Sequence, residues 1–181
     1  NGGLSTAEGS PTSNFPLRGG KGWLYEGGIR VPYIIKTPYM KGSAGICKTP
    51  VSSTDFYPTI LELTGATLKP YQHKDGVSLV PLLKGNRVFD RGAIYFHYPH
   101  YGGKGDSPAG AIRKGDYKLI WFYEDDHIEL YNLKMDISEK ENLAETQKER
   151  ALSLQKELQE WLCSCAAKMP VYNPDYKEIK Y

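Results

Sequence analysis

A long amphipathic helix near the C-terminus constrains the fold more than any other feature of the sequence. From about Thr146 to Ala167, apolar residues recur at the spacing of one helix face. They are Leu154, Leu158, Trp161, Leu162 and Cys165. A stripe of this width must be buried against another layer of secondary structure. It therefore predicts an α+β layer in which the helix covers a sheet and Cys165 fills part of the core.

Short segments upstream of the helix predict that sheet. Ala93–Tyr98 is aromatic and β-branched. Ala109–Arg113 and Tyr117–Phe122 flank Gly115-Asp116, a two-residue connection typical of a β-hairpin. His127–Tyr131 follows a second turn. Because the connections are short, we expect an antiparallel sheet.

The first half of the chain predicts a different arrangement. The apolar run Val31–Ile35 is typical of a buried strand. We expect a helix over Asp55–Leu63, capped by one of the hydroxyl residues 52–54, with Pro58 in its first turn. Leu79–Leu83 predicts one further helical turn.

Charge and glycine are concentrated at the N-terminal end. The net charge of the 181 residues is only +2, which argues against nucleic acid or a membrane surface as partner. Residues 1–53 nevertheless carry a local charge of +4, and eight of the 19 glycines fall within residues 1–28. A cationic, glycine-rich segment suits an anion site. It is also typical of an ordinary basic surface loop, and composition leaves both interpretations open.

The cysteines and the hydropathy exclude several classes of protein. Three cysteines are too few for a disulfide framework. Cys163 and Cys165 lie two positions apart on the predicted helix and point to opposite sides, which argues against a shared zinc ion. The longest apolar run is far shorter than the ~20 residues that span a bilayer. No nucleotide-binding or serine-hydrolase motif occurs.

Two histidines at the end of a predicted strand are candidate functional residues. His97 and His100 precede a glycine-rich loop that contains Lys104. Histidine in such a place can bind a ligand or act in catalysis. Surface histidines in an aromatic turn explain the pattern equally well.

Residues 16–32 are more specific than composition explains. Lys21 lies between two glycines, which leaves its ammonium free to reach an oxyanion, whereas Glu26 and Arg30 have the spacing of a structural ion pair. The segment Gly-Lys-Gly, followed by Tyr-Glu-Gly-Gly-Ile-Arg-Val-Pro, closely resembles the sulfatase family of the alkaline phosphatase superfamily. The resemblance continues downstream in residues 53–65, 75–83, 111–120 and 129–142.

The resemblance implies the fold class and its division. It indicates an α/β protein with the alkaline phosphatase-like sulfatase fold, of which this chain would be the C-terminal portion. Residues 1–85 would end the large α/β catalytic domain, with residues 31–35 in its sheet. Residues 86–181 would form the smaller C-terminal α+β subdomain.

The resemblance also implies a chemistry. Family sulfatases cleave sulfate esters with a formylglycine, made from Cys or Ser in a Cys/Ser-x-Pro-x-Arg motif, and with a calcium ion. Asn1, followed by two glycines, resembles a calcium ligand of the family. Lys21 matches the lysine that contacts the sulfate, which makes it the catalytic and substrate-binding candidate. A sulfated carbohydrate or aryl sulfate is the expected substrate, with His97, His100 and Lys104 shaping its choice.

One departure limits what the 181 residues are expected to do. They contain no Cys/Ser-x-Pro-x-Arg motif, since Cys47 is followed by a proline one position too late. The chain is therefore expected to be a fragment, inactive alone, whose partner is the N-terminal part of the catalytic domain. The family implies a periplasmic or secreted location. The alternatives are a phosphonate or phosphate monoester hydrolase of the same superfamily and a non-catalytic carbohydrate-binding module.

Overall fold

The computed structural model describes residues 1–6, 8–37, 45–86, 89–103 and 106–176. The chain divides into two compact units. Asn1–Val31 and Tyr95–Tyr181 form one, the sheet unit, and Pro32–Ile94 forms the other, the helical unit. The predicted division at residue 85 concerns the domains of a complete sulfatase, so it stays a prediction.

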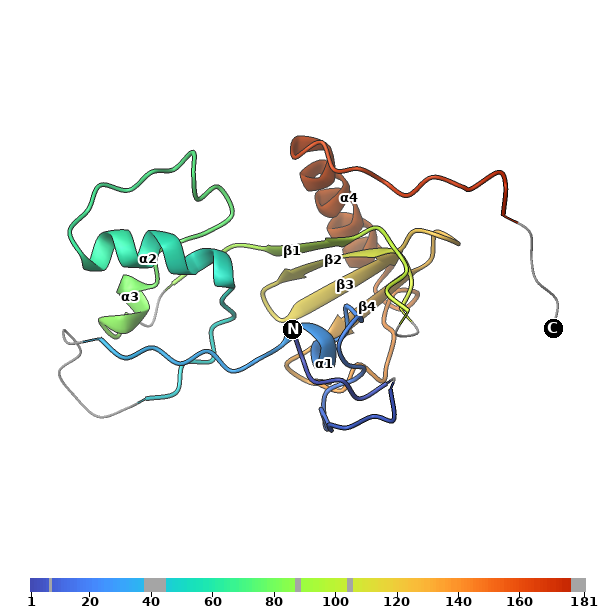
Figure 1. Ribbon diagram of the computed structural model, residues 1–181, viewed down its shortest axis with the longest axis horizontal. Coiled ribbons are helices and arrows are strands. Elements are labelled where there is room, and N and C mark those ends of the chain that lie inside the picture. The colour runs from blue at the N-terminus through green and yellow to red at the C-terminus, as the bar shows by residue number, and fades with distance from the viewer. Residues whose placement is uncertain (7, 38–44, 87–88, 104–105, 177–181) are drawn as a thin grey trace. The chain divides into compact units, whose positions relative to one another are not determined.

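The sheet unit is built on four strands in the order of the sequence (Figure 1). They are β1 (Ile94–Tyr98), β2 (Ala109–Lys114), β3 (Tyr117–Phe122) and β4 (Ile128–Asn132). β3 pairs antiparallel with β2 and with β4, and Lys114 lies opposite Tyr117. Gly115-Asp116 therefore forms the turn, where Gly115 has a φ of 57° that glycine adopts without strain. The strands and the hairpin predicted from the sequence are confirmed.

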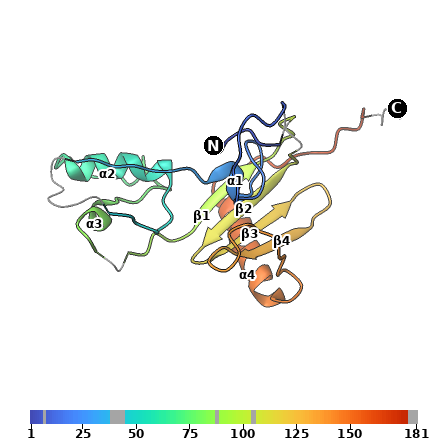
Figure 2. The same ribbon diagram turned by 90° about the horizontal axis from the view of Figure 1, so that it is seen from below.

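Helix α4 (Lys148–Ser164) covers one face of this sheet (Figure 2). Its buried stripe consists of Ala151, Leu154, Leu158 and Leu162. Strand side chains alternate between faces, and Arg150 of α4 lies 4.0 Å over the ring of Tyr117. That contact assigns Leu119, which is completely buried, to the α4 face. Each large aliphatic side chain buried there contributes about 1.5–3 kcal/mol.

The C-terminal end of α4 differs from the expectation. The predicted core position of Cys165 is wrong, because the helix ends at Ser164 and Cys165 is exposed. Ala166 has a φ of 50°, which turns the chain out of the helix before the apolar stripe is complete.

The opposite face of the sheet packs on the N-terminal segment. Ile120, Phe122 and Tyr131 form a hydrophobic cluster with Tyr25. Tyr25 immediately precedes the short helix α1 (Glu26–Ile29). The sheet therefore lies between α4 on one side and the segment that contains Lys21 on the other.

The helical unit contains η1 (Ser53–Asp55), α2 (Phe56–Leu63) and α3 (Val80–Leu83). Ser52 and Asp55 form a capping box, in which the Ser52 N–H donates to Asp55 Oδ2 at 2.7 Å. The structure confirms the predicted helix and its cap, with Pro58 in the first turn of α2. It also confirms the helical turn predicted before Lys84.

The strand predicted over Val31–Ile35 is wrong for this chain. The segment is irregular, and Val31 and Ile34 are 50% and 90% exposed. A buried strand needs hydrogen-bonded neighbours and a covering layer. None of the described strands pairs with this segment.

Candidate functional site

The segments that carry Asn1 and Lys21 lie side by side. The Gly2 N–H donates to the Gly28 carbonyl at 2.8 Å, and the Lys21 N–H donates to the Gly3 carbonyl at 3.0 Å. Both Asn1 and Lys21 are exposed. Two residues singled out from separate parts of the sequence are therefore held on neighbouring backbone segments.

Asn14 joins the same two segments through its carboxamide. Its Nδ2 donates to the carbonyls of Gly3 and Gly19 at 2.9 and 3.1 Å and to Ser5 Oγ at 2.9 Å. Its Oδ1 accepts from the Gly3 N–H at 3.2 Å. The side chain is saturated within the protein, which indicates a structural role for Asn14.

Close backbone packing explains why the sequence is rich in glycine here. A Cβ at Gly2 would lie 1.8 Å from the Gly27 carbonyl oxygen, and one at Gly28 would lie 2.0 Å from that of Trp23. Neither position has room for a side chain unless the backbone moves. These two glycines serve the packing of one loop on another, whatever the loop binds.

Residues 18–27, the Lys21 loop, are closed at their base and anchored on aromatic rings. The Gly27 N–H donates to the Arg18 carbonyl at 2.8 Å. The Arg18 guanidinium lies 3.9 Å over the ring of Tyr25 and donates to the Tyr131 hydroxyl at 2.8 Å. The Tyr25 hydroxyl donates to Glu129 at 2.7 Å. Burial raises the pKa of Tyr25, so the phenol stays a neutral donor.

A buried ion network holds the end of the loop. Lys118 Nζ lies 3.0 Å from Glu26 Oε1 and 2.6 Å from Glu139 Oε1, and all three residues are buried. Glu26 also pairs with Arg30 at 3.4 Å, which confirms the predicted structural pair. Desolvation raises the pKa of Glu139, and the ammonium of Lys118 opposes that rise.

The two candidate histidines differ in their contacts. His97 Nε2 lies 3.0 Å from the Lys168 carbonyl, which only accepts, so Nε2 carries a proton. His97 Nδ1 lies 2.9 Å from the Tyr123 hydroxyl. Both ring nitrogens of His97 are thus taken up inside the sheet unit. His100 is exposed, with its ring edge-on to Tyr98 at a centroid distance of 4.8 Å, and Lys104 lies outside the described residues.

The described residues do not complete a calcium site by themselves. No cluster of three or more His, Cys, Asp or Glu side chains within the described ranges is arranged to hold a metal ion. The Asn1 carboxamide oxygen is a suitable ligand type, but calcium takes 6–8 oxygen ligands. The donor set present does not complete a site, so we derive no reaction step through the ion.

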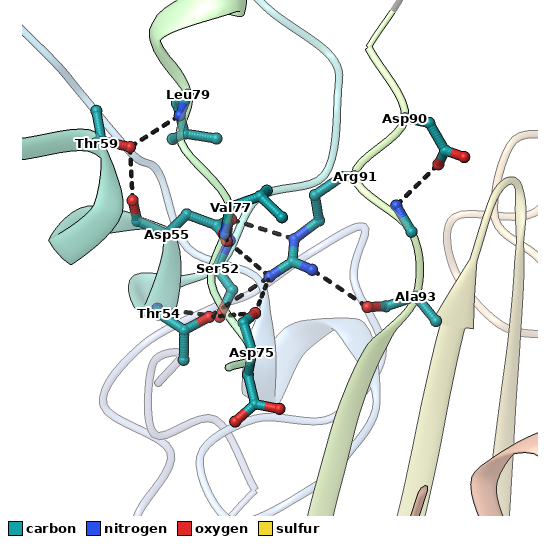
Figure 3. Close-up of polar contacts among 11 residues, drawn as sticks. Ser52, Thr54, Asp55, Thr59, Asp75, Val77, Leu79, Asp90, Arg91 and Ala93 are labelled. Carbon is teal, nitrogen blue, oxygen red and sulfur yellow. Dashed lines mark hydrogen bonds and ion pairs between the residues drawn. The ribbon is translucent and has the colours of Figure 1, made fainter. Parts of the chain in front are cut away.

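The helical unit has a polar centre that sequence reasoning missed (Figure 3). Asp55 is completely buried and accepts from Arg91 through both oxygens, Nη2 to Oδ1 at 2.8 Å and Nε to Oδ2 at 3.2 Å. The N–H groups of Ser52 and Val77 donate to the same carboxylate at 2.7 and 2.9 Å. Arg91 also donates to the Asp75 carbonyl at 3.0 Å. These contacts fix the chain around residues 75–77, and no local pattern around Arg91 signals the role.

Comparison with known proteins gives the family. Residues 19–168 match the family described as N-sulphoglucosamine sulphohydrolase, C-terminal. The chain belongs to this sulfatase family. The match includes Lys21 and both candidate histidines.

Individual sulfatases extend the match over most of the chain. It is 36% identical to a sulfatase of Formosa agariphila, covering 94% of this chain and 34% of the relative. It is 33% identical to the N-acetylglucosamine-6-O-sulfatase of Bacteroides thetaiotaomicron, covering 87% of this chain and 28% of that protein. The chain thus spans about a third of the length of these sulfatases.

Solved structures confirm the predicted fold class. The crystal structure of Ps i-CgsB in complex with k-i-k-neocarrahexaose has a TM-score of 0.71 at 30% identity. It covers 84% of this chain and 33% of the solved one. BT4656 in complex with D-glucosamine-2-N,6-O-disulfate has a TM-score of 0.51 at 32% identity, over 64% of this chain and 24% of that chain.

Proposed function

We propose that this chain is the C-terminal part of a sulfuric ester hydrolase and supplies the lysine that contacts the sulfate group. The observation that carries the proposal is the pairing of the Asn1 segment with the Lys21 loop. Within the described part of the chain, the exposed Lys21 side chain forms no hydrogen bond or ion pair. Its ammonium is available for an anion, whereas the charged and hydroxyl side chains of Arg18, Tyr25 and Glu26 are held by contacts within the sheet unit.

The chemistry required of Lys21 follows from the charge on the ester. Hydrolysis places negative charge on the sulfuryl oxygens and on the departing oxygen. A fixed ammonium close to those atoms binds the substrate and stabilises the charge as it develops. Lys21 is suited to this as a compact point charge.

The proposal includes calcium and a nucleophile from outside these residues. Asn1 would contribute one oxygen ligand to a calcium ion, and the remaining ligands would come from outside these residues. A formylglycine would come from a further segment, because the 181 residues lack the Cys/Ser-x-Pro-x-Arg motif. We therefore expect the isolated chain to hydrolyse no sulfate ester.

A sulfated glycan is the proposed substrate. The relative named N-acetylglucosamine-6-O-sulfatase and the neighbours solved with neocarrahexaose and with D-glucosamine-2-N,6-O-disulfate support this class. His100, exposed beside Tyr98, is proposed to contact the sugar, and Lys104 is proposed to do the same. His97 would act indirectly, by holding the end of strand β1, after which His100 and Lys104 follow in the sequence. A periplasmic or secreted location is part of the proposal. Among the described residues, none of the helices has the length and hydropathy of a membrane span.

The decisive test replaces Lys21 in the full-length enzyme that contains this chain. Lys21→Met should lower kcat for an aryl sulfate by about 10²–10³-fold, as expected for loss of a group that stabilises transition-state charge. Lys48→Met is the matched control, because Lys48 is also exposed and basic but lies outside the Lys21 loop. Full activity of Lys21→Met contradicts the proposal.

Three further assays test the proposal. Turnover of an aryl sulfate by the purified 181-residue chain alone would show that no outside nucleophile is needed. Faster hydrolysis of an aryl phosphate or phosphonate than of the sulfate by the full-length enzyme would favour a monoester hydrolase instead. His100→Ala should change KM for sulfated oligosaccharides and leave that for a small aryl sulfate unchanged.

A further inference from the structure

Both ends of the Lys21 loop contact one residue far away in the sequence. At the start, Arg18 Nη1 donates to the Glu139 carbonyl at 2.9 Å. At the end, the Glu26 N–H donates to Glu139 Oε2 at 2.7 Å. The Gly27 N–H closes the base of the loop on the Arg18 carbonyl at 2.8 Å. A single residue therefore holds the loop at the two points where it leaves and rejoins the body of the sheet unit.

We propose that Glu139 is a positioning residue that holds the Lys21 loop in its working geometry. The inference rests on the proposed function of Lys21 for its chemical meaning. The contacts that carry it belong to the sheet unit alone.

The local geometry at Glu139 suits this role. The residue is completely buried and its φ of 53° is uncommon for a residue with a side chain. That backbone conformation directs both the carbonyl and the carboxylate of one residue to the loop. A further hydrogen bond stabilises the turn that contains Glu139, in which the Lys140 N–H donates to the Asp136 carboxylate at 2.7 Å. A conformation of this kind persists when its surroundings determine it, and it occurs often at functional sites.

The second carboxylate oxygen of Glu139 makes the anchor rigid. Oε1 lies 2.6 Å from Lys118 Nζ, in the interior of strand β3. Because Lys118 also binds Glu26, the carboxylate is fixed between the sheet and the end of the loop. The ion pair at Oε1 and the hydrogen bond from the Glu26 N–H to Oε2 together occupy both oxygens of the carboxylate. Movement of Glu139 would therefore move Glu26 and, through the closed base, the loop.

Other contacts keep the loop attached when Glu139 is changed. Arg18 still donates a hydrogen bond to the Tyr131 hydroxyl, and the Tyr25 hydroxyl still donates to Glu129. Glu139→Gln retains the length of the side chain and the backbone carbonyl, but its amide replaces one oxygen by a donor that faces Lys118 or the Glu26 N–H. We expect a loosened loop on a folded sheet unit.

Hydrogen exchange of the 181-residue chain tests this directly. In Glu139→Gln, the amides of Lys21, Trp23 and Gly27 should exchange at least about tenfold faster, while those of strands β2 and β3 change less. The control is Leu158→Ala, which opens a cavity on the α4 face without touching the loop. Unchanged loop exchange in Glu139→Gln, or the same selective acceleration in Leu158→Ala, overturns the inference.

Kinetics of the full-length enzyme separate positioning from stability. With an aryl sulfate well below the melting temperature, Glu139→Gln should lower kcat about tenfold or more, with a smaller change in KM. Leu158→Ala should leave both constants unchanged under the same conditions. An unchanged kcat in Glu139→Gln contradicts the role of Glu139.

Lys21→Met, measured in parallel, separates the two proposals. If Lys21→Met retains full activity, the proposed function fails, whatever Glu139 does to loop exchange. If Lys21→Met is inactive and Glu139→Gln changes neither loop exchange nor kcat, only the positioning role fails.

Discussion

The two units bury charge at their centres, and they do so in different ways. In the sheet unit, Lys118 is a point cation shared by Glu26 and Glu139, at 3.0 and 2.6 Å. In the helical unit, Asp55 is a carboxylate bound by the Nε and Nη2 groups along one edge of the Arg91 guanidinium and by two backbone N–H groups.

The difference shows what each centre can hold. The planar fork of arginine matches one carboxylate in one orientation, so the Asp55 centre gathers Ser52, Val77 and Arg91 around a single carboxylate. An ammonium has no preferred plane and can gather carboxylates from separate segments. The Lys118 centre accordingly joins a strand, the end of the Lys21 loop and the turn at Glu139. Both centres hold irregular segments of the chain that the hydrogen bonds of sheets and helices do not order.

The largest effect is expected at the shared cation. Lys118→Met leaves two buried carboxylates without their common partner, and should lower the free energy of unfolding of the sheet unit by about 3–5 kcal/mol. Urea unfolding followed by exchange of the β2 and β3 amides measures it. A loss below about 1 kcal/mol would mean that an apolar side chain replaces the cation without cost, and the contrast with Asp55 would then disappear.

A smaller and more local loss of stability is expected when the Arg91–Asp55 pair is changed. Arg91→Lys retains the charge and loses the paired contact, so we expect a loss of about 1.5–3 kcal/mol confined to the helical unit. Exchange of the Val77 and Leu79 amides reports the loop. Arg113→Lys is the control, since Arg113 donates one bond to a turn carbonyl at 2.9 Å. Equal effects of the two substitutions would show that the fork geometry is unimportant.

The packing of the Lys21 loop gives a third prediction. Gly28→Ala places a methyl group 2.0 Å from the Trp23 carbonyl oxygen, so the backbone must shift. We expect a loss of about 1–3 kcal/mol in the sheet unit, by the usual cost of overpacking. Gly45→Ala is matched in chemistry, and a Cβ there meets nothing within 4 Å. Thermal unfolding of the two variants should differ clearly, and identical melting temperatures would contradict the packing described.

The smallest effect is expected at an exposed pair. Glu157 and Lys114 lie 2.7 Å apart with side chains 29% and 51% exposed. Glu157→Gln should change the free energy of unfolding by only about 0.2–1 kcal/mol, and less at high salt. The same urea titration measures it. A loss comparable to that of Lys118→Met would show that burial does not explain why the Lys118 network contributes more than this exposed pair.

Periodicity predicted the elements that bury a face of their own. The α4 stripe and the four strands are confirmed because each pattern has its covering layer within the chain. Val31–Ile35 has the apolar character of a strand but no described strand to pair with, and the pattern alone carries no information about a partner. Cys165 fits the helical period, but Ala166 turns the chain before that position is buried.

The candidate site was predictable in part. Lys21 and Asn1 follow from the resemblance to sulfatases, and their roles stay proposals. Lys118 alternates with apolar neighbours in β3, where a lysine usually indicates a solvent-facing position. Its burial depends on Glu26 and Glu139, and the Glu26 contact spans 92 residues of sequence. Contacts of this range leave no local signal, so neither the ion network nor the role of Glu139 follows from sequence patterns.

The distance along the chain between the loop and its anchor has a consequence for biosynthesis. Glu26 precedes Glu139 by 113 residues, and Arg18 precedes it by 121. At a synthesis rate of roughly 5–20 residues per second, the loop emerges about 6–24 s before the residue that fixes it. Throughout that interval the lysine is present but its loop lacks this anchor. The geometry around Lys21 is completed only after Glu139 has been synthesised.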